Sequence, residues 1–418
     1  MLLSHETVIR TNSTSANIIG HMCYAASKLW NVCNYERNNY RELGLQKYPD
    51  WYYQKAVHKD NIWYKTLPSQ TAQEICKLLD KSWKSFYRLQ KTGGIKNPKP
   101  PRYKQSGITV TYMQNGIVHE QGADTVRLSL PKALKEHMLS VYGISNNYLF
   151  LKNEVFRNTD VIKQIKIYPP EADGRCRLIV IYEVPDVEPV EDNGRYLSID
   201  LGLHNLMTCY DNSGKSFILG RKYLSVIHRY DREIARVQSQ WAKVQADAGV
   251  RYPRPSKHLL KLYDKKRHSV KDYLHKITRY IADYCRSEGI STVVIGDITG
   301  IRKDNDLGSR INQQLHSLPY AQLYTMLEYK LKMYGIRPVK QEESYSSQCS
   351  PMSQDVSERS AHKSSRIKRG LYLDGVMIFN ADAVGAYNIL RKYCAVSGTV
   401  IDMPASGLSN AEVIKAAV

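Results

Sequence analysis

Two spacings of apolar residues divide the chain into helical and extended regions. From residue 18 to residue 41, apolar side chains recur every three or four positions, which predicts one buried face of a helix. The same period predicts a second helix that begins near Pro68 and runs through Phe86. From 106 to 185 the pattern changes to short β-branched and aromatic runs, which predict the strands of a small β domain. A basic segment with glycines and prolines, 91–104, is predicted to be an extended linker.

The second predicted helix carries a polar stripe on another of its faces. Gln70, Gln73 and Lys77 follow one another at intervals of three or four residues. Such a stripe is either a solvated surface or a face laid against a nucleic acid duplex, where glutamine contacts base edges and lysine contacts phosphate. These three residues are therefore candidate nucleic-acid-binding residues.

After residue 195 the order of the predicted elements is more specific. Three short strands come first, then a long amphipathic helix, an apolar strand suited to burial on both faces, a helix, a strand and a final helix. Their approximate ranges are 195–200, 205–210, 215–219, 270–284, 292–297, 320–334, 336–342 and 381–393. This is the element order of an RNase H-like domain.

Two aspartates occupy positions at which that architecture gathers acidic side chains. Asp200 ends the first strand, and Asp382 lies in the first turn of the last helix, where the helix dipole favours a carboxylate. Taken alone, Asp382 is more simply explained as an ordinary charge at a helix N-terminus. Phosphodiester hydrolysis gives the pair a function, because two hard cations held about 4 Å apart by carboxylates activate water and stabilise the leaving oxygen.

The composition indicates a polyanionic partner. The 418 residues include 60 lysines and arginines against 40 aspartates and glutamates, a formal net charge of +20, and a core cannot hold that many unpaired cations. A merely basic or ribosome-associated protein is the alternative. The 31 tyrosines either stack on unpaired bases or serve as half-buried packing residues, and their number does not decide between the two.

Cysteines and apolar runs argue against several other classes of protein. The eight cysteines form no C-x-x-C pair, which disfavours a disulfide framework and a zinc ribbon. No apolar run approaches the roughly 20 residues of a membrane span, and the N-terminus lacks the pattern of a signal peptide. We therefore expect an intracellular protein that does not bind a membrane.

Several motifs taken together resemble the TnpB family, transposon-encoded RNA-guided endonucleases with a RuvC nuclease domain that are related to type V CRISPR effectors. The motifs in the second half are SIDLGLHNL (198–206), VVIGD (293–297), SYSSQCS (344–350), and Asp382 with Asn388 and Ile389 downstream. Those in the first half are LPSQ (67–70), KSWKSF (81–86) and KPPRYK (99–104). As a set they cover most of residues 1–395.

The resemblance implies a fold class of α/β with additional all-α and β parts. An RNase H-like RuvC nuclease domain is expected together with an N-terminal helical recognition region and a small β-barrel wedge domain. The expected boundaries are 1–14 for the first wedge strand, 15–100 for the recognition domain, 101–190 for the wedge, 191–348 for RuvC, 349–378 for a basic insert, 379–395 for the final RuvC helix and 396–418 for a loosely attached tail.

The resemblance also implies an RNA-guided DNA endonuclease. Such a protein binds a structured guide RNA, reads a short target-adjacent motif in double-stranded DNA, forms an R-loop and cuts the DNA. The helix with Gln70, Gln73 and Lys77 is the candidate motif reader. The implied cofactors are the guide RNA and two Mg²⁺ ions, with Mn²⁺ as a substitute, and the implied location is the prokaryotic cytoplasm, associated with the nucleoid. A nuclease-dead RNA-guided repressor and a guide-free transposase remain alternatives.

One departure from the family pattern concerns the second carboxylate. The family has a glutamate at the end of the fourth strand, where this chain has Gly296. Glu343 at the end of the fifth strand is the expected replacement, with Asp297 and no replacement as the other possibilities. Asp297 is the weaker candidate because a shift of one residue along a strand moves a side chain to the other face. The expected catalytic and metal-binding set is therefore Asp200, Glu343 and Asp382.

A second departure concerns zinc. Many relatives carry a four-cysteine zinc ribbon between the fifth strand and the last helix, whereas this chain keeps only Cys349 there. No structural zinc is therefore predicted. The basic insert at this place is expected to contact nucleic acid, the alternative being a solvated loop.

Overall fold

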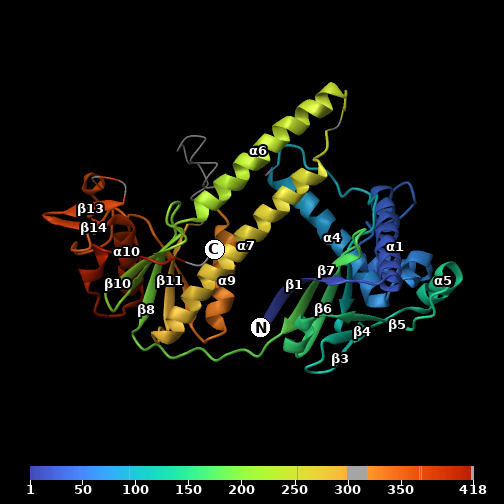
Figure 1. Ribbon diagram of the computed structural model, residues 1–418, viewed down its shortest axis with the longest axis horizontal. Coiled ribbons are helices and arrows are strands. Elements are labelled where there is room, and N and C mark those ends of the chain that lie inside the picture. The colour runs from blue at the N-terminus through green and yellow to red at the C-terminus, as the bar shows by residue number, and fades with distance from the viewer. Residues whose placement is uncertain (94, 252, 299–317, 367, 369, 416–418) are drawn as a thin grey trace. The chain divides into compact units, whose positions relative to one another are not determined.

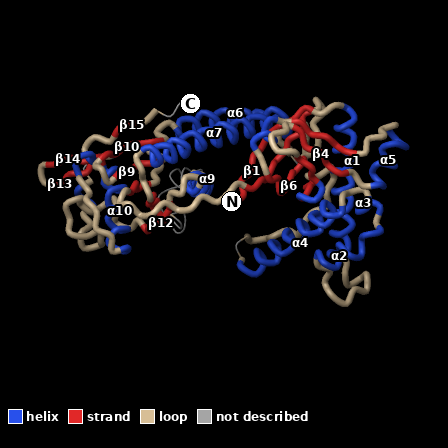
Figure 2. The backbone as a smooth tube through the Cα atoms, turned by 90° about the horizontal axis from the view of Figure 1, so that it is seen from below, coloured by secondary structure: helices blue, strands red, loops and turns tan. Residues whose placement is uncertain are grey.

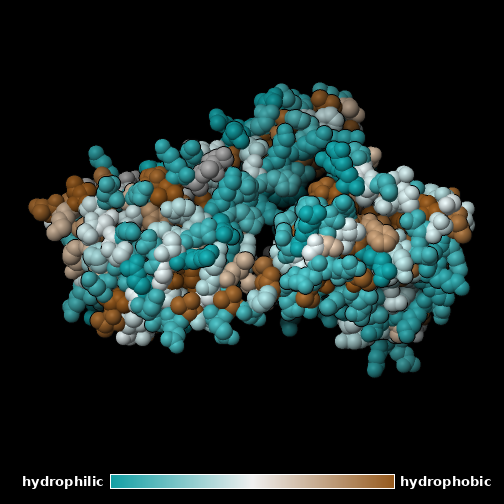
Figure 3. Space-filling view, turned by 60° about the horizontal axis from the view of Figure 1, so that its bottom comes forward, coloured by the Kyte–Doolittle hydropathy of each residue, from teal (hydrophilic) through white to brown (hydrophobic). Residues whose placement is uncertain are grey.

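The computed structural model describes residues 1–415 except 94, 252, 299–317, 367 and 369. The chain divides into two compact units, Met1–Pro185 and Asp186–Val418, and each is described by itself. No helix in the described part of the chain is both long enough and apolar enough to cross a membrane. On the face of the molecule seen in Figure 3, hydrophilic side chains predominate and apolar ones are scattered among them.

The first unit contains a group of helices, of which α1 and α4 each bury an apolar stripe. The helices are α1 (Ser13–Asn38), α2 (Trp51–Val57), α3 (Ile62–Lys65), α4 (Ser69–Thr92) and α5 (Lys132–Tyr142). The side chain of Asn12 starts α1 by accepting a hydrogen bond from the backbone of Ser15. A buried ion pair between Arg37 and Asp80, with 3.0 Å between Nη1 and Oδ1, ties α1 to α4.

The segment predicted to be an extended linker is attached to α1. The side chains of Trp30 and Asn34 donate hydrogen bonds to the backbone carbonyls of Arg102 and Pro101, at 3.1 Å and 2.9 Å. Asn31 both donates to and accepts from the backbone of Lys104. An extended chain leaves its backbone groups unpaired, and here the polar side chains of α1 satisfy several of them.

The strands of the first unit pair as two antiparallel sheets. One has the order β1-β7-β6-β2 and the other the order β3-β4-β5. Their bounds are β1 (Leu2–Arg10), β2 (Val110–Met113), β3 (Ile117–His119), β4 (Thr125–Ser129), β5 (Tyr148–Lys152), β6 (Val161–Ile167) and β7 (Arg175–Glu183). The N-terminal strand thus pairs with a strand more than 160 residues later in the chain. A closed barrel stays a prediction, because the described strands pair as two sheets.

The second unit is built around one mixed sheet with the order β12-β11-β8-β9-β10-β15. Its strands are β8 (Tyr196–Asp200), β9 (Met207–Asp211), β10 (Lys215–Leu219), β11 (Thr292–Asp297), β12 (Arg337–Glu342) and β15 (Glu412–Val413). The first three run antiparallel to one another, and β11 and β12 run parallel to β8. The carboxyl ends of β8, β11 and β12 therefore meet at one edge of the sheet.

Helices cover both faces of this sheet. They are α6 (Tyr223–Asp247), α7 (Lys257–Ser287), α9 (Tyr320–Lys332) and α10 (Ala381–Ser397), and a small hairpin of β13 (Leu371–Asp374) and β14 (Met377–Asn380) precedes α10. Leu197 of β8 belongs to the core that includes α7 and α9, whereas Tyr196 belongs to the core built on α10. Figure 1 and Figure 2 show α6 and α7 side by side as a long hairpin.

The end of the chain is attached to the sheet, and the prediction of a loosely attached tail is wrong for residues up to 415. Residues Glu412 and Val413 form β15, which pairs with β10. Leu408 is fully buried, and the hydroxyl of Tyr210 donates to the carbonyl of Pro404 at 2.9 Å. The segment therefore covers the β10 edge, which would otherwise present unpaired backbone groups.

Candidate active site

Asp200 and Asp382 meet where the central strand β8 approaches α10. Asp200 is the last residue of β8, on the same face as Ser198, whose hydroxyl donates to the carbonyl of Ala386 at 2.7 Å. A Cβ atom added to Gly385 would lie only 2.6 Å from Oδ2 of Asp200. Gly385 is three residues after Asp382 and so lies on the same side of the helix. The missing side chain at position 385 makes room for the carboxylate of Asp200 beside Asp382.

Glu343 occupies the space that a side chain at position 296 would fill. Gly296, the residue before the end of β11, lies on the face that carries α10, and a Cβ atom added there would overlap Oε2 of Glu343. The same Cβ would lie 3.4 Å from the carbonyl oxygen of Ile199, the neighbour of Asp200. The carboxylate expected from β11 is therefore replaced in space by one from the residue that follows β12.

Asp297, the alternative, belongs to the other side of the sheet. Strand alternation places it with Val293 and Ile295, which pack in the core of α7 and α9. After desolvation, the charges that raise the pKa of Asp200 are those of Glu343 and Asp382, and Asp297 is not among them. Of the two candidates for the missing acid, Glu343 is the one that shares a face with Asp200.

Mutual repulsion and loss of water perturb the carboxyl groups. Desolvation, then the charges of Glu343 and Asp382, raise the pKa of Asp200 well above its ordinary range. Desolvation also raises the pKa of Glu343 to about 7, with smaller contributions from Glu342 and Asp297. Acidic groups that are pushed toward their neutral forms in this way are typical of functional sites.

Asp382 is fixed by three neighbours. The side chain of Asn380 caps α10 and accepts a hydrogen bond from the backbone of Asp382 at 3.0 Å. Asn205 donates a hydrogen bond to Oδ2 of Asp382 at 2.8 Å, and Nη2 of Arg366 lies 3.6 Å from Oδ1 of Asp382. Asn205 lies shortly after β8. This part of the chain therefore carries Asp200 at the end of the strand and also orients Asp382.

The three carboxylates have the chemistry that a hard divalent cation requires. Oε2 of Glu343 is buried and has no hydrogen-bond partner in the described part of the chain, so it has an unused acceptor directed into the site. Carboxylate oxygens are the ligands that Mg²⁺ prefers, usually together with water and substrate phosphate. Among the described residues no three such side chains are close enough to form a complete ligand set. Asp200, Glu343 and Asp382 are the residues of this edge that would hold such an ion.

Sequence reasoning missed the residues that hold Glu343 in place. The side-chain amide of Asn388, on α10, is fully buried and donates to the carbonyls of Ser346 and Cys349 at 2.8 Å and 2.9 Å. The backbone of Ser346 in turn donates to the carbonyl of Glu343 at 3.1 Å. Between them Tyr345 has a φ of +64°, a strained conformation that persists only where its surroundings hold it.

Two further residues of α10 bind the same segment. Arg391 donates to the carbonyl of Ser350 at 3.1 Å and to the side chain of Asn388 at 3.0 Å. Lys392 contacts the carboxylate of Glu342 and donates to the carbonyl of Ser344 at 3.0 Å. The helix that carries Asp382 therefore also fixes the loop that carries Glu343. The only sequence signal for this was Asn388, which the motif after Asp382 contains.

The three residues predicted to read DNA differ in their accessibility on α4. Gln70 is exposed. Gln73 is half-buried, and its side chain forms a hydrogen bond with Tyr64. Lys77 donates to Glu74 at 2.8 Å and lies 4.9 Å from the centre of the Trp51 ring. Of the three, Gln70 is the residue whose side chain forms no hydrogen bond or ion pair with another described residue.

Comparisons with known proteins agree with this architecture. Residues 179–302 match the family OrfB_IS605, described as a probable transposase, and residues 320–389 match the Cas12f1-like TNB domain. InsQ of Escherichia coli (strain K12), an RNA-guided DNA endonuclease by name, is 21% identical over 375 residues, which are 87% of this chain and 84% of InsQ. A Cas12f1 chain, solved by cryo-EM with sgRNA and target DNA, covers 90% of this chain over 83% of its own length, with 15% identity and a TM-score of 0.58. The fold is thus a mixed α/β fold similar to that of Cas12f1, and the matches taken together support a member of the TnpB family.

Proposed function

We propose that this chain is an RNA-guided DNA endonuclease that hydrolyses phosphodiester bonds at Asp200, Glu343 and Asp382. The observation that carries the proposal is the convergence of these three acids at one edge of the sheet, with the Glu343 carboxylate in the space left by Gly296. A surface with a net charge of +20 has little reason to gather acids unless they bind cations. The name of InsQ agrees with the same activity.

An RNase H-like RuvC core is the architecture that we infer for the second unit. Support comes from the order β12-β11-β8-β9-β10, in which the first strand is central and carries Asp200 at its end. We propose the remaining domains as expected from the sequence, with the helices α1–α4 as the recognition region and the strands β1–β7 as the wedge.

The residues that would hold Mg²⁺ or Mn²⁺ are Asp200, Glu343 and Asp382. When bound, such ions activate water and stabilise the leaving oxygen of a phosphodiester. The chain itself contributes orientation, since Asn380 and Asn205 fix Asp382. Asn388 fixes the loop of Glu343, and bound cations would favour the ionised forms of Asp200 and Glu343, whose pKa values are raised.

We propose that base pairing with a guide RNA selects the DNA target and that α4 contacts the adjacent motif. A glutamine can form two hydrogen bonds with one adenine edge, and Gln70 is exposed for such a contact. Contacts to the guide and to the DNA backbone would depend on the many surface lysines and arginines and therefore on salt.

Cleavage of a matched duplex by the purified complex tests the proposal. The complex with its copurifying RNA is incubated in Mg²⁺ with DNA that carries the complementary sequence and a randomised flanking motif. We expect both strands to be cut, and we expect Asp200→Ala to abolish cutting while DNA binding is retained, because only cation ligation is lost. DNA that is bound but left intact by the wild-type complex would instead indicate the nuclease-dead repressor.

A further inference from the structure

The hairpin of α6 and α7 is a strongly basic extension of the second unit. Residues 223–287 contain 15 lysines and arginines against 6 aspartates and glutamates. A small apolar seam of its own joins the two helices, formed by Ile234, Val237, Leu259 and Leu262 with Tyr230 against it. This seam accounts for the pairing of the two helices, but it does not account for the excess of positive charge.

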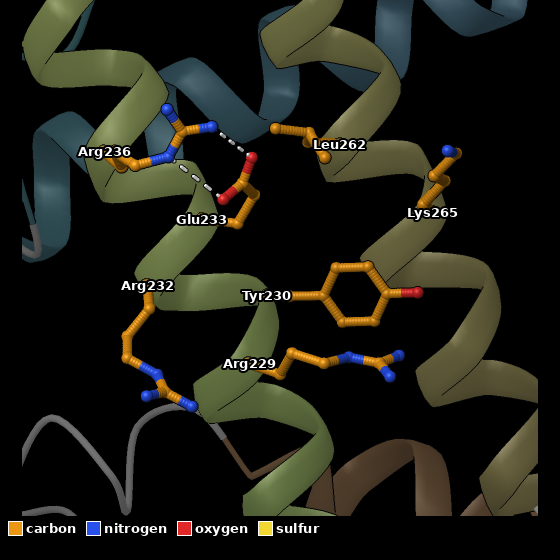
Figure 4. Close-up of a pocket in the computed structure, with 7 residues that line it drawn as sticks. All are labelled: Arg229, Tyr230, Arg232, Glu233, Arg236, Leu262 and Lys265. Carbon is orange, nitrogen blue, oxygen red and sulfur yellow. Dashed lines mark hydrogen bonds and ion pairs between the residues drawn. The ribbon is translucent and has the colours of Figure 1, made fainter.

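A groove of about 530 Å³ lies along this seam, and cations surround it. Its lining residues are Arg229, Tyr230, Arg232, Glu233, Arg236, Leu262 and Lys265. Figure 4 shows the ring of Tyr230 between α6 and α7 with Arg229 beside it, and the guanidinium group of Arg236 bonded to Glu233; Arg232 extends from the other side of α6. Leu262 is buried at the floor, while all four cationic residues are exposed.

Three of the four cations have no acidic partner in the described part of the chain. Arg229, Arg232 and Lys265 form no ion pair there, and the guanidinium of Arg229 lies 5.2 Å from the centre of the Tyr230 ring. Some other cations of the hairpin are neutralised: Lys266 binds Asp231, Arg267 binds Asp264, and Lys276 binds Asp272. The groove therefore holds three cations without an acidic partner among the described residues, and what sets them apart from other unpaired lysines of the hairpin is that they line one hollow.

We propose that this groove binds the ribose-phosphate backbone of the guide RNA. The proposal rests on the function proposed above, which implies a guide RNA. It adds a site on the protein that binds this RNA independently of its base sequence. The groove has no asparagine or glutamine among its lining residues, the side chains that most often pair with base edges besides arginine and lysine. A guide of variable sequence has to be held through its backbone.

The spacing of the arginines suits more than one phosphate. Arg229, Arg232 and Arg236 recur at intervals of three and four residues on one face of α6 and span about 10 Å along its axis. A nucleic acid strand has one phosphate for about every 3.4 Å of helix axis. Lys265 approaches from the opposite wall on α7.

Glu233 is the feature that favours RNA over DNA. Its carboxylate is neutralised by Arg236 and can accept a hydrogen bond from the 2′-hydroxyl of ribose, a donor that deoxyribose lacks. The hydrogen bonds from Arg236, 3.2 Å and 2.7 Å long, fix the carboxylate at the rim of the groove. A carboxylate has further lone pairs with which to accept a hydrogen bond.

Binding of two homopolymers that differ only in the 2′-hydroxyl tests the proposal. Oligouridylate and oligodeoxyuridylate of equal length are titrated with the full chain in EDTA at several salt concentrations, with fluorescence anisotropy as the readout. For Arg229→Gln/Arg232→Gln/Lys265→Gln we expect roughly tenfold weaker RNA binding. The plot of log binding constant against log salt concentration should also become less steep by about 2, because each contact with a single-strand phosphate contributes about 0.7 to this slope. For Glu233→Gln we expect the preference for RNA over the deoxy strand to fall.

The matched control removes the same charge from cations that are already paired. Arg267→Gln/Lys276→Gln/Arg279→Gln alters three residues of α7 that bind Asp264, Asp272 and Asp283, and it should change the slope little. Equal slopes for the groove and control variants would overturn the groove as a binding site. An RNA preference that survives Glu233→Gln unchanged would overturn the assignment to RNA. Neither assay needs DNA cleavage, so an inactive wild-type nuclease would refute the proposed function separately.

Discussion

Position 296 and the carboxylate of Glu343 compete for one space beside Asp200. A glutamate on β11 would reach the site from within the sheet ladder, whereas Glu343 reaches it from the loop after β12. Glu343 follows β12, so strand pairing does not fix its backbone. Hydrogen bonds from Asn388, Arg391 and Lys392 on α10 hold the loop instead. A side chain at 296 and the present position of Glu343 therefore exclude each other.

Gly296→Ala tests this exclusion with one methyl group. The added Cβ would displace the Glu343 carboxylate, and we expect the single-turnover cleavage rate to fall roughly 10–100-fold, as for other disturbances of the groups around metal ligands. Binding of RNA and DNA should be unchanged. Gly20→Ala in helix α1 is the control, because the added Cβ would meet open space and the backbone there has no positive φ. Cleavage at the wild-type rate by Gly296→Ala would contradict the account.

Asn388→Ala tests the role of α10 in placing Glu343. The change leaves two buried carbonyls without a donor, and we expect a loss of stability on the order of 1–3 kcal/mol. Cleavage should fall more than folding explains, by roughly 10–100-fold, and the rise in melting temperature on addition of Mn²⁺ should shrink. Val396→Ala, at an exposed position of the same helix, is the control. An unchanged cation response in Asn388→Ala would show that its role is structural alone.

The raised carboxyl pKa values predict how stability changes with pH when no metal is bound. Glu343 has a pKa of about 7 in the folded chain against an ordinary value of 4.5, so between these values the folded state holds a proton that the unfolded state releases. The free energy of unfolding should therefore decrease as pH rises from about 4.5 to 7, by on the order of 1–3 kcal/mol. Urea unfolding in EDTA measures it, and Glu343→Gln should have a shallower slope. A free energy of unfolding that increases over this pH range in the wild type, but not in Glu343→Gln, would contradict the prediction.

At the scale of elements, Gln70 is the part of the polar stripe of α4 that we expect to contact DNA, because the side chains of Gln73 and Lys77 already have partners within the first unit. Gln70→Ala should therefore reduce discrimination between the correct and a scrambled adjacent motif by about 1–3 kcal/mol, the value of one good base contact. Gln73→Ala, whose side chain bonds to Tyr64, should affect mainly the stability of the first unit. Competition binding with the two DNA sequences measures both. Equal discrimination by Gln70→Ala and the wild type would exclude this helix position as the reader.

The elements that the sequence predicted well are those with a strong local period. The strand ending at Asp200 and the helix beginning before Asp382 were expected close to their observed bounds, and alternation along a strand was enough to prefer Glu343 over Asp297. The short strands β3 and β4 and helix α5 were missed, because their few buried residues leave little pattern. The hydrogen bonds of Asn388 join residues about 40 positions apart, and no local spacing contains that information.

At the scale of the whole molecule, the basic groove and the proposed catalytic acids belong to different parts of the second unit. The basic residues are concentrated on the α6–α7 hairpin, whereas the acids converge at the sheet edge beside α10. Removal of groove cations should alter the salt dependence of nucleic acid binding, and removal of an acid should alter cutting. This separation makes the two proposals independently testable.

The most direct test of the central claim is the cleavage of matched DNA in Mg²⁺ by three forms of the complex. The wild type should cut, Glu343→Gln should bind DNA but lose at least about 100-fold in cutting rate, and Gly296→Glu/Glu343→Ala should recover part of the loss because the acid returns to the same space from β11. Cutting by Glu343→Gln at the wild-type rate would contradict the account, since Glu343 would then not supply the missing carboxylate.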